Sequence, residues 1–255
     1  MNSDPRFRVA ARAAGVHLLC SVAVAILAAV LVLGLWYPYP YRELSGGREL
    51  FLLIIAVDGV CGPILTSVLF NPAKPRRELW QDMALVVLLQ TMALGYGVWT
   101  TWQARPLYLA LEVDRFKVVM SADIDHEALE RLPVDLRPLT YGGVRTVALR
   151  PPLDVQEKNK VLFQAIEGGR DYAERPEFYI PYKGEAALAS LKRAKPLESF
   201  LQKYPDQKPV ADAMAKERNG ELKDWKLLPV TGRQDWVALL DKSGNIQGFI
   251  KGDGF

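Results

Sequence analysis

The sequence is poor in the residues that build metal centres and disulfide frameworks. Among 255 residues there are two cysteines, Cys20 and Cys61, and two histidines, His17 and His126. Both cysteines lie in apolar runs, where a thiol usually packs as a small hydrophobic group. No Cys-x-x-Cys or His-Glu-x-x-His pattern occurs, so we expect neither a structural nor a catalytic zinc site. Because residues 104–255 contain no cysteine, this part suits an oxidising compartment without needing disulfides.

Motifs of the common enzyme classes are also missing. The chain has no Gly-x-Ser-x-Gly, no phosphate-binding loop and no dinucleotide-binding fingerprint. Its carboxylates are numerous but scattered, as on an ordinary charged surface. We therefore expect no enzymatic activity, no cofactor and no small-molecule substrate.

Charge divides the chain into two unlike parts. Residues 1–103 hold 8 Lys and Arg and 6 Asp and Glu, whereas residues 104–255 hold 24 and 23. The sequence thus predicts a membrane domain over 1–103 and a soluble domain over 104–255, which is long enough for a core of its own. The near-neutral balance of the second part argues against nucleic acid as a partner.

Three apolar runs in the first part are long enough to cross a bilayer as helices, at about residues 16–36, 50–70 and 79–102. The first follows a basic N-terminus, as in a signal peptide, but it is longer than a typical signal core. It ends in an aromatic cluster rather than in a small-x-small cleavage site. We therefore expect an uncleaved first helix and three helices in contact with membrane lipid.

Basic residues in the short loops predict how these helices are oriented. Residues 1–15 carry three arginines and residues 71–78 carry three basic residues, against two in residues 38–49. Lysine and arginine concentrate in cytoplasmic loops. This pattern predicts a cytoplasmic N-terminus and, after three crossings, a C-terminal domain outside the inner membrane, in the periplasm of a bacterium with two membranes.

The second part predicts an α+β domain on an antiparallel sheet. Strands are expected over residues 106–120, 144–149, 225–229, 235–240 and 247–251. Helices are expected over residues 123–132, 154–166, 185–194, 197–203 and 209–217. The first strand is expected to bend near Asp114, and Asp154 is expected to cap the second helix. Residues 172–182 are expected to form an ordered loop, and residues 241–245 a hairpin turn.

Asp58 is the one charged residue of the second apolar run and lies near its middle. A carboxylate at that depth costs at least about 2.5 kcal/mol on insertion scales, so it has either an internal partner or a function. The candidate internal partners are His17, Gln81, Asp82 and Gln90. The other interpretations are contact with a partner's membrane helix and a proton path, for which one carboxylate alone is a poor relay.

Gly59, Gly62 and Pro63 follow this aspartate and have two interpretations. They form either a notch that admits a partner helix or ordinary small-residue packing among the three helices, which is the commoner case. The proline also predicts a kink. Gly95 and Gly97 in the third run have the same two interpretations.

Two segments of the soluble part are candidate partner-binding surfaces. They are Asp114, Arg115 and Phe116 in the first segment and Arg175, Phe178 and Tyr179 in the second. The first segment either contacts a partner or forms a local ion pair on a solvated face. The second either binds an extended peptide through its aromatic rings or closes over the core as a loop.

Four motifs occur in order along nearly the whole chain. They are Trp36-Tyr37-Pro38, Ala56-Val57-Asp58 with Gly62-Pro63, Arg105-Pro106 with residues 112–116, and residues 175–179 with Pro181-Tyr182. Each motif alone is weak, but together, on a chain with three apolar runs, they are fairly specific. In this arrangement the chain resembles the type IV pilin accessory proteins of the TfpX/TfpZ kind.

The resemblance implies an inner-membrane accessory factor whose partner is the type IV major pilin. It implies a role in pilin stability, pilus assembly or pilus number through binding rather than catalysis, and it transfers no catalytic residues. One alternative is a membrane-anchored sensor or scaffold whose outer domain binds something other than pilin. Another is a membrane enzyme subunit that uses Asp58.

Overall fold

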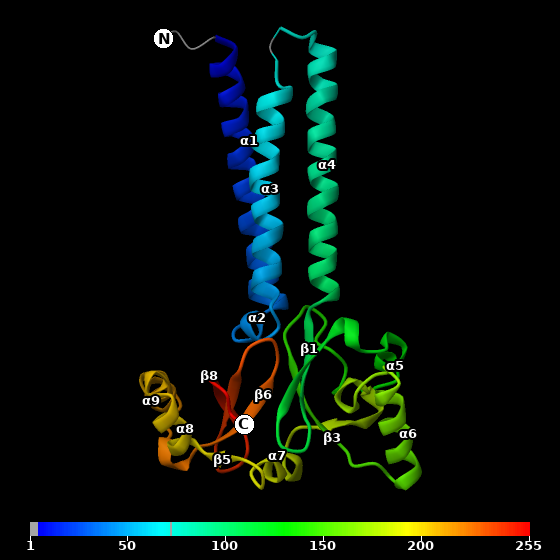
Figure 1. Ribbon diagram of the computed structural model, residues 1–255, viewed down its shortest axis with the longest axis vertical. Helices are drawn as coiled ribbons and strands as arrows, with labels where there is room; N and C mark the ends of the chain where they lie inside the picture. The colour runs from blue at the N-terminus through cyan, green and yellow to red at the C-terminus, as the bar shows by residue number, and fades with distance from the viewer. Residues whose placement is uncertain (1–4, 72) are drawn as a thin grey trace. The chain divides into compact units, whose positions relative to one another are not determined.

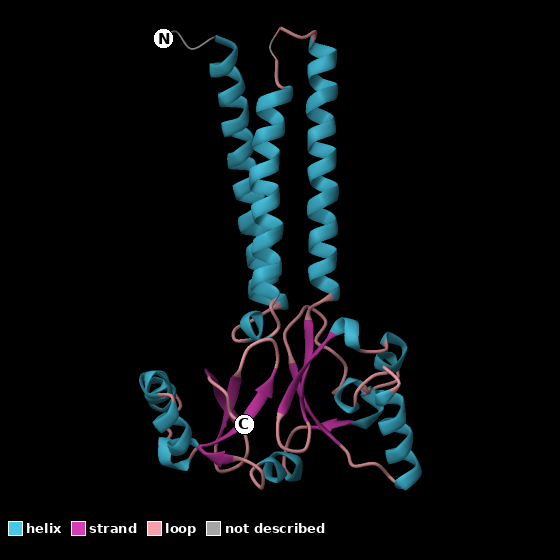
Figure 2. Cartoon of the chain, in the orientation of Figure 1, coloured by secondary structure: helices cyan, strands magenta, loops and turns pink. Residues whose placement is uncertain are grey.

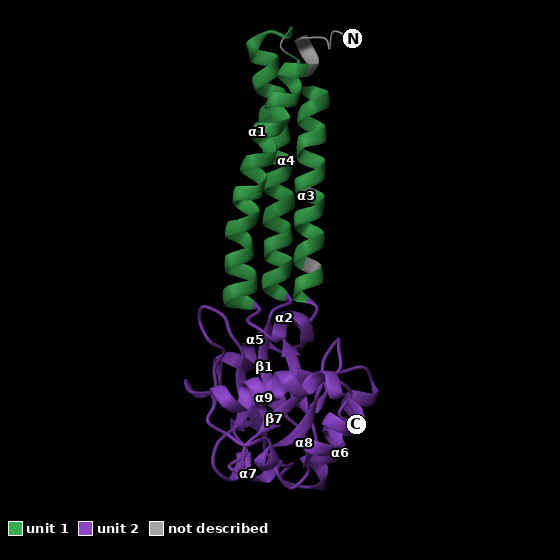
Figure 3. Ribbon diagram, turned by 90° about the vertical axis from the view of Figure 1, so that its left-hand side faces the viewer, with its two compact units in different colours: residues 1–36, 47–103 green, residues 37–46, 104–255 purple. Residues whose placement is uncertain are grey.

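The computed structural model describes residues 5–71 and 73–255, except for the side chains of residues 5–7, 50 and 58. The chain forms two compact units, which Figure 3 shows in different colours. One comprises the chain up to Trp36 together with Gly47–Gln103, and the other comprises Tyr37–Gly46 together with Ala104–Phe255. The second unit thus combines residues 104–255 with ten residues, 37–46, from the part of the sequence for which a membrane domain is predicted.

The first unit consists of long apolar helices. They are α1 (Pro5–Ala29), which continues as the π-helix η1 (Val30–Trp36), α3 (Gly47–Leu69) and α4 (Arg76–Gln103). Three helices of the described chain are long and apolar enough to cross a membrane, and they coincide with the three predicted runs. Helix α3 contacts both α1 and α4 and continues through Pro63.

The second unit is built on one sheet of eight strands (Figures 1 and 2). The strands are β1 (Pro106–Leu111), β2 (Phe116–Met120), β3 (Arg145–Leu149), β4 (Tyr179–Pro181), β5 (Lys195–Pro196), β6 (Lys226–Thr231), β7 (Trp236–Leu240) and β8 (Ile246–Lys251). Seven of them lie in the order β4-β3-β1-β2-β6-β7-β8, and β5 pairs with β6 outside this order. Because β1 is parallel to β3 and β2 is parallel to β6, the sheet is mixed, and the expected antiparallel sheet is wrong in this respect.

Short helices surround this sheet. They are α2 (Tyr41–Leu44), α5 (His126–Glu130), α6 (Val155–Ile166), α7 (Glu185–Ser190), α8 (Leu197–Lys203) and α9 (Lys208–Glu217). Single 3-10 turns are η2 (Ser121–Asp123), η3 (Tyr172–Glu174), η4 (Pro176–Phe178), η5 (Pro205–Gln207) and η6 (Leu222–Asp224). The predicted cap of α6 is confirmed, since Asp154 Oδ1 accepts a hydrogen bond from the Glu157 amide at 2.7 Å. The helix expected over 123–132 is shorter, being divided between η2 and α5.

The long strand expected over residues 106–120 is instead the hairpin of β1 and β2. The Glu112 amide donates to the Arg115 carbonyl at 2.9 Å and closes the turn. The charged residues 112, 114 and 115 interrupt two apolar segments, and a turn leaves them half-buried at the end of the hairpin while both segments pair. The bend that we expected near Asp114 is therefore a complete reversal of the chain.

Apolar side chains are buried on both faces of the sheet. Successive residues of a strand point to opposite faces. Accordingly, Leu109 and Leu111 belong to one hydrophobic cluster, while Tyr108 and Ala110 belong to another. A third cluster packs α8 and α9 against β7 and β8, with Phe200, Ala215 and Leu239 among its members.

Residues 37–46 complete the first of these clusters. Tyr41 and Leu44 are buried in it beside Trp236, and the Arg233 amide donates to the Leu44 carbonyl at 2.7 Å. The rings of Tyr39 and Trp236 also meet edge to face at 5.9 Å. The short segment between the first two apolar helices is therefore a structural element of the second unit.

Candidate functional site

The two glycines of the predicted notch in α3 have different surroundings. A Cβ atom built on Gly59 would have no heavy atom within 4 Å, so this position is open. A Cβ on Gly62 would collide with Gln90 and lie 2.9 Å from His17 Nε2. Gly62 therefore lies where the three helices meet, and Gly59 leaves space beside α3. The side chain of Asp58, which we expected to have an internal or external partner, lies outside the described residues.

A buried polar contact lies beside Gly62. His17 Nδ1 and Thr66 Oγ1 share a hydrogen bond of 2.7 Å, and Thr66 is 2% exposed. The contact ties α1 to α3. Polar groups in apolar surroundings are stabilised by such interhelical pairing.

The two glycines of α4 also differ: one is close to a neighbouring helix and the other is open. A Cβ on Gly97 would lie 2.8 Å from Ile54 Cγ2 of α3, whereas a Cβ on Gly95 would have nothing within 4 Å. Gly97 thus permits the close approach of α3 and α4. Gly95 has no such role among the described contacts.

An apolar groove of about 390 Å³ runs between α3 and α4. Its lining includes Val57, Cys61 and Leu65 of α3 and Leu89, Ala93 and Tyr96 of α4. The surface of this groove offers contacts of shape and dispersion rather than hydrogen bonds. The sequence indicated small residues here, but it did not reveal which face of α3 and α4 stays open.

In the second unit, the three residues of the predicted segment 114–116 differ in exposure: the first two lie at the surface and the third lies in the core. Arg115 Nε donates to Asp114 Oδ1 at 2.9 Å, and both side chains are partly exposed at the hairpin turn, 39% for Arg115 and 49% for Asp114. The Arg115 guanidinium also lies 4.8 Å from the centre of the Phe255 ring. Phe116 is fully buried beneath this turn. Our expectation that Phe116 presents a binding surface is therefore wrong, because its ring is part of the core.

The segment at Arg175 likewise contributes mainly to the core. Phe178 is 2% exposed and Tyr179 is 5% exposed. The Tyr179 hydroxyl donates to the Ala173 carbonyl at 2.7 Å. These rings are not available to an extended peptide, so that interpretation is wrong for both. The segment closes over the core and contributes the short strand β4, where we expected only loop.

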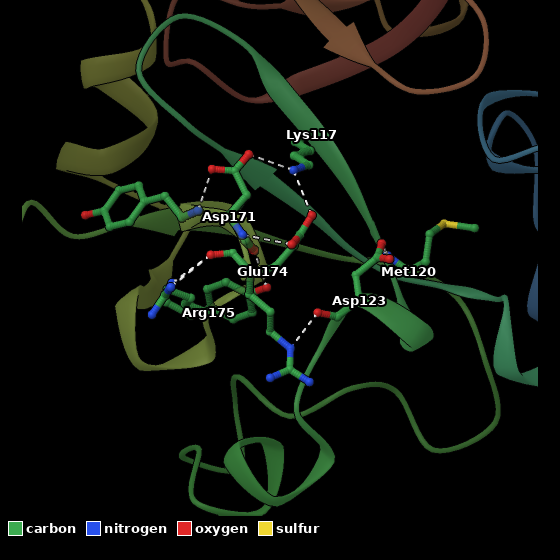
Figure 4. Close-up of polar contacts among 10 residues, drawn as sticks. Lys117, Met120, Asp123, Asp171, Glu174 and Arg175 are labelled. Carbon is green, nitrogen blue, oxygen red and sulfur yellow. Dashed lines mark hydrogen bonds and ion pairs between the residues drawn. The ribbon is translucent and has the colours of Figure 1, made fainter. Parts of the chain in front are cut away.

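Arg175 itself makes hydrogen bonds within the unit, as Figure 4 shows. Its guanidinium donates to Gln164 Oε1 at 2.9 Å and to the Arg170 carbonyl at 2.9 and 3.1 Å. A cleft of about 410 Å³ lies beside it, between residues of α5, α6 and the turns η3 and η4. Arginine and carboxylate groups both line this cleft, so its charge is mixed.

Lys117 forms a second polar centre that the sequence analysis missed (Figure 4). Its Nζ lies 2.9 Å from Asp171 Oδ2 and 2.9 Å from Glu174 Oε1. Burial lowers the pKa of Lys117, but the hydrogen bonds to Glu174 and Asp171 outweigh this and raise it. Burial raises the pKa of nearby Glu112, and the Asp171 charge adds to that effect. Asp171 and Glu174 lie more than fifty residues from Lys117 in sequence, and no local signal links them.

No group of three or more His, Cys, Asp and Glu side chains in the described part of the chain is arranged to hold a metal ion.

Comparison with known proteins places the chain in a family. Residues 5–46 match the family model described as "Fimbrial assembly protein FimB". The fimbrial assembly protein of Dichelobacter nodosus serogroup I is 33% identical over 253 residues, which are 98% of this chain and 98% of that protein.

Further relatives from the same organism agree. The serogroup E1 protein has the same identity and coverage. The protein of serogroups C1 and C2 is 39% identical over 128 residues, which are 50% of this chain and 95% of that relative. No solved structure matches significantly. On the strength of the full-length similarity, the chain belongs to the FimB family of fimbrial assembly proteins.

Proposed function

We propose that this protein promotes fimbrial assembly from the bacterial inner membrane by binding the unassembled type IV pilin, without catalysing a reaction. The observation that carries the proposal is the similarity, over 98% of the chain, to two proteins named for fimbrial assembly. The four sequence motifs of the pilin accessory family agree with it.

The proposal gives the first unit an intramembrane role. A type IV pilin awaiting assembly resembles a single apolar helix with a soluble head. The groove between α3 and α4 is apolar and lies along helices long enough to cross a membrane. Gly59 is open but lies about 160° around α3 from Cys61, so it belongs to another side of the helix. We propose that the pilin helix packs in the groove along Val57, Cys61 and Leu65, with Asp58 next to Val57 in the sequence.

The proposed orientation places the N-terminus in the cytoplasm and the second unit in the periplasm. Residues 37–46 pack into the core of the second unit, so they and residues 104–255 belong on one side of a membrane. Two apolar helices, α3 and α4, separate them in sequence. Two crossings return the chain to the same side, which supports three spans in total, and the loop charges support the direction.

The two native cysteines provide a matched test of the intramembrane contact. Cys61 lines the groove, whereas Cys20 is exposed on α1 and does not line it. A pilin with one cysteine in its apolar helix is coexpressed, and membranes are treated with a short bifunctional maleimide. We expect a pilin adduct of the variant that retains only Cys61 and little adduct of the variant that retains only Cys20. Adducts through Cys20 alone would contradict the proposed groove.

A deletion strain tests the function itself. We expect fewer surface fimbriae and less twitching motility, both restored by the intact gene. Unchanged fimbriation would instead favour a sensor or scaffold for another ligand. Asp58→Asn tests the enzyme alternative, because the variant cannot transfer a proton but keeps the shape of the side chain. Loss of function in this variant would favour the enzyme alternative over a binding role.

A further inference from the structure

Helix α6 is mounted on the second unit with its apolar side outward. None of its residues is buried. The exposed fractions are 70% for Val155, 53% for Leu162, 62% for Phe163 and 72% for Ile166, and 81% for the preceding Leu153. At 3.6 residues per turn, positions 155, 162, 163 and 166 lie along one side of the helix, with the polar residue Asn159 among them. An amphipathic helix of a soluble domain normally buries this side.

The inward side of α6 is held by polar contacts instead. Arg150 donates to both carboxylate oxygens of Glu157, at 2.9 and 2.8 Å. Nearer the other end, Arg175 donates to Gln164. Bidentate arginine–carboxylate pairs fix geometry as well as contributing energy. Two arginines thus bond to the inward side of the helix, where Val161 and Ala165 are also half-buried, and the apolar stripe is left in solvent.

We infer that this stripe, Leu153, Val155, Leu162, Phe163 and Ile166, is the surface by which the second unit contacts the soluble head of the unassembled fimbrial subunit. The inference rests on the proposed function for the identity of the partner. The contacting part of the subunit is an apolar patch bordered by carboxylates. It contacts the stripe through its apolar side chains and the flanking lysines of α6 through its carboxylates.

Charge complementarity supports an acidic border on the partner. Lys158 and Lys160 are exposed on opposite flanks of the stripe. The carboxylate of Glu157 is on the inward side, bonded to Arg150, and Glu167 lies beyond the end of the helix. The flanks along the middle of the stripe are therefore cationic, while its two ends carry the exposed carboxylates of Asp154 and Glu167. Cationic groups on a partner are unfavourable beside the two lysines.

The size of the stripe argues against a second copy of this chain as the occupant. Five side chains that are 53–81% exposed make a patch on the order of 600 Å², at the upper end of the range in which exposed patches of monomers are often functional. A stable complex buries about 800 Å² on each partner. A transient contact with a subunit that must later be released fits the smaller area.

Within the second unit, helix α6 is separated from the residues that lead into the apolar helices. Strand β1 begins at Pro106, which follows the last apolar helix closely, and β3 runs parallel to β1. Helix α6 follows the far end of β3 and lies beside that end of the sheet in Figure 1. Within the second unit, the stripe is thus remote from the residues that lead into the apolar helices.

Photocrosslinking in living cells tests the inference in the full-length protein. A photoreactive phenylalanine analogue replaces Phe163 in one variant and Phe255, an exposed aromatic residue outside the stripe, in the control. We expect an adduct with the major fimbrial subunit from position 163, at least tenfold stronger than from position 255. Three outcomes would overturn the inference: an adduct between two copies of this chain, an adduct with lipid, or no adduct at position 163.

Charge reversal on the flanks gives a second measurement. The stripe and α6 should survive Lys158→Glu with Lys160→Glu, because both side chains are exposed. We expect the adduct at position 163 to fall at least fivefold, and to be unchanged by the control pair Lys208→Glu with Lys216→Glu on α9. If the α6 and α9 charge-reversal variants give equal amounts of adduct, the partner does not have the proposed acidic border. If Cys61 still captures pilin while position 163 does not, this inference fails and the proposed function stands.

Discussion

Lys251 Nζ lies 2.5 Å from Glu43 Oε2, an ion pair that joins strand β8 to the segment between the first two apolar helices. The pair is one of several contacts through which residues 37–46 become part of the second unit. Its own contribution is modest, because the lysine side chain is about half exposed. The buried side chains of the same segment matter more, since they complete a hydrophobic cluster that the C-terminal residues leave open.

Leu44 provides the sharpest test of this arrangement. The side chain is fully buried against the sheet core, so Leu44→Ala leaves a cavity and should cost about 2–5 kcal/mol of unfolding free energy. The expected result is lower resistance of the second unit to proteolysis and heat in detergent. Leu188→Ala serves as the control, because Leu188 is 52% exposed. Equal stability of the two variants would mean that residues 37–46 are a mere linker.

Gly97 and Gly95 form a matched pair within one helix. Gly97→Ala places a methyl group 2.8 Å from Ile54 Cγ2, so α3 and α4 must separate or repack, at a cost of about 1–3 kcal/mol. Gly95→Ala adds the same methyl group where no atom lies within 4 Å. Thermal unfolding in detergent should therefore be earlier for the first variant only. A similar shift for both would show that helix–helix distance is not set at Gly97.

The regular elements were largely predictable from sequence, because their signals are local. The three apolar runs, the cap at Asp154 and the hairpin turn at residues 241–245 each depend on neighbouring residues, and each is present. The parallel pairing of β2 with β6 joins residues more than a hundred positions apart. No periodicity in either strand identifies its partner, so an antiparallel sheet was the natural but incorrect expectation.

The candidate site was less predictable, because burial decides which residues of a motif remain exposed. Phe116 and Phe178 stand beside charged residues in sequence, yet both are core residues. In α6 the opposite occurs. Its apolar period was visible, but a helical period predicts an inward apolar face. The arginine contacts at Glu157 and Gln164, together with half-buried Val161 and Ala165, hold the opposite side of the helix on the domain.

The Arg150–Glu157 pair predicts how acid affects the attachment of α6. The hydrogen bond with Arg150 is the main reason that the pKa of Glu157 is lowered to about 2, with a smaller contribution from the Leu153 amide. A carboxylate whose pKa is lowered on folding contributes stability above its unfolded pKa, near 4.5, and loses it as pH falls toward 2. Stability conferred by Glu157 should therefore be complete at pH 6 and decline between about pH 4.5 and 2.

Glu157→Gln makes this measurable. Hydrogen exchange of the α6 amides should be faster in the variant than in the parent protein at pH 6, and the difference should shrink steadily as pH is lowered. Glu127→Gln is the control, because its side chain is 84% exposed and its pair with Arg131 is long, at 3.9 Å. A difference in exchange rate that grows as pH falls would contradict the predicted loss of the Glu157 contribution in acid.

The proposed topology predicts the behaviour of reporter fusions at two positions. A reporter active only in the cytoplasm, fused after Phe255, should be inactive, because three crossings place this end outside. The same reporter fused after Pro75, in a chain truncated behind two of the three apolar helices, should be active. The second fusion controls for expression and insertion. Activity at Phe255 would place the second unit in the cytoplasm, away from unassembled pilin heads, and would remove the physical basis for a contact between α6 and the fimbrial subunit.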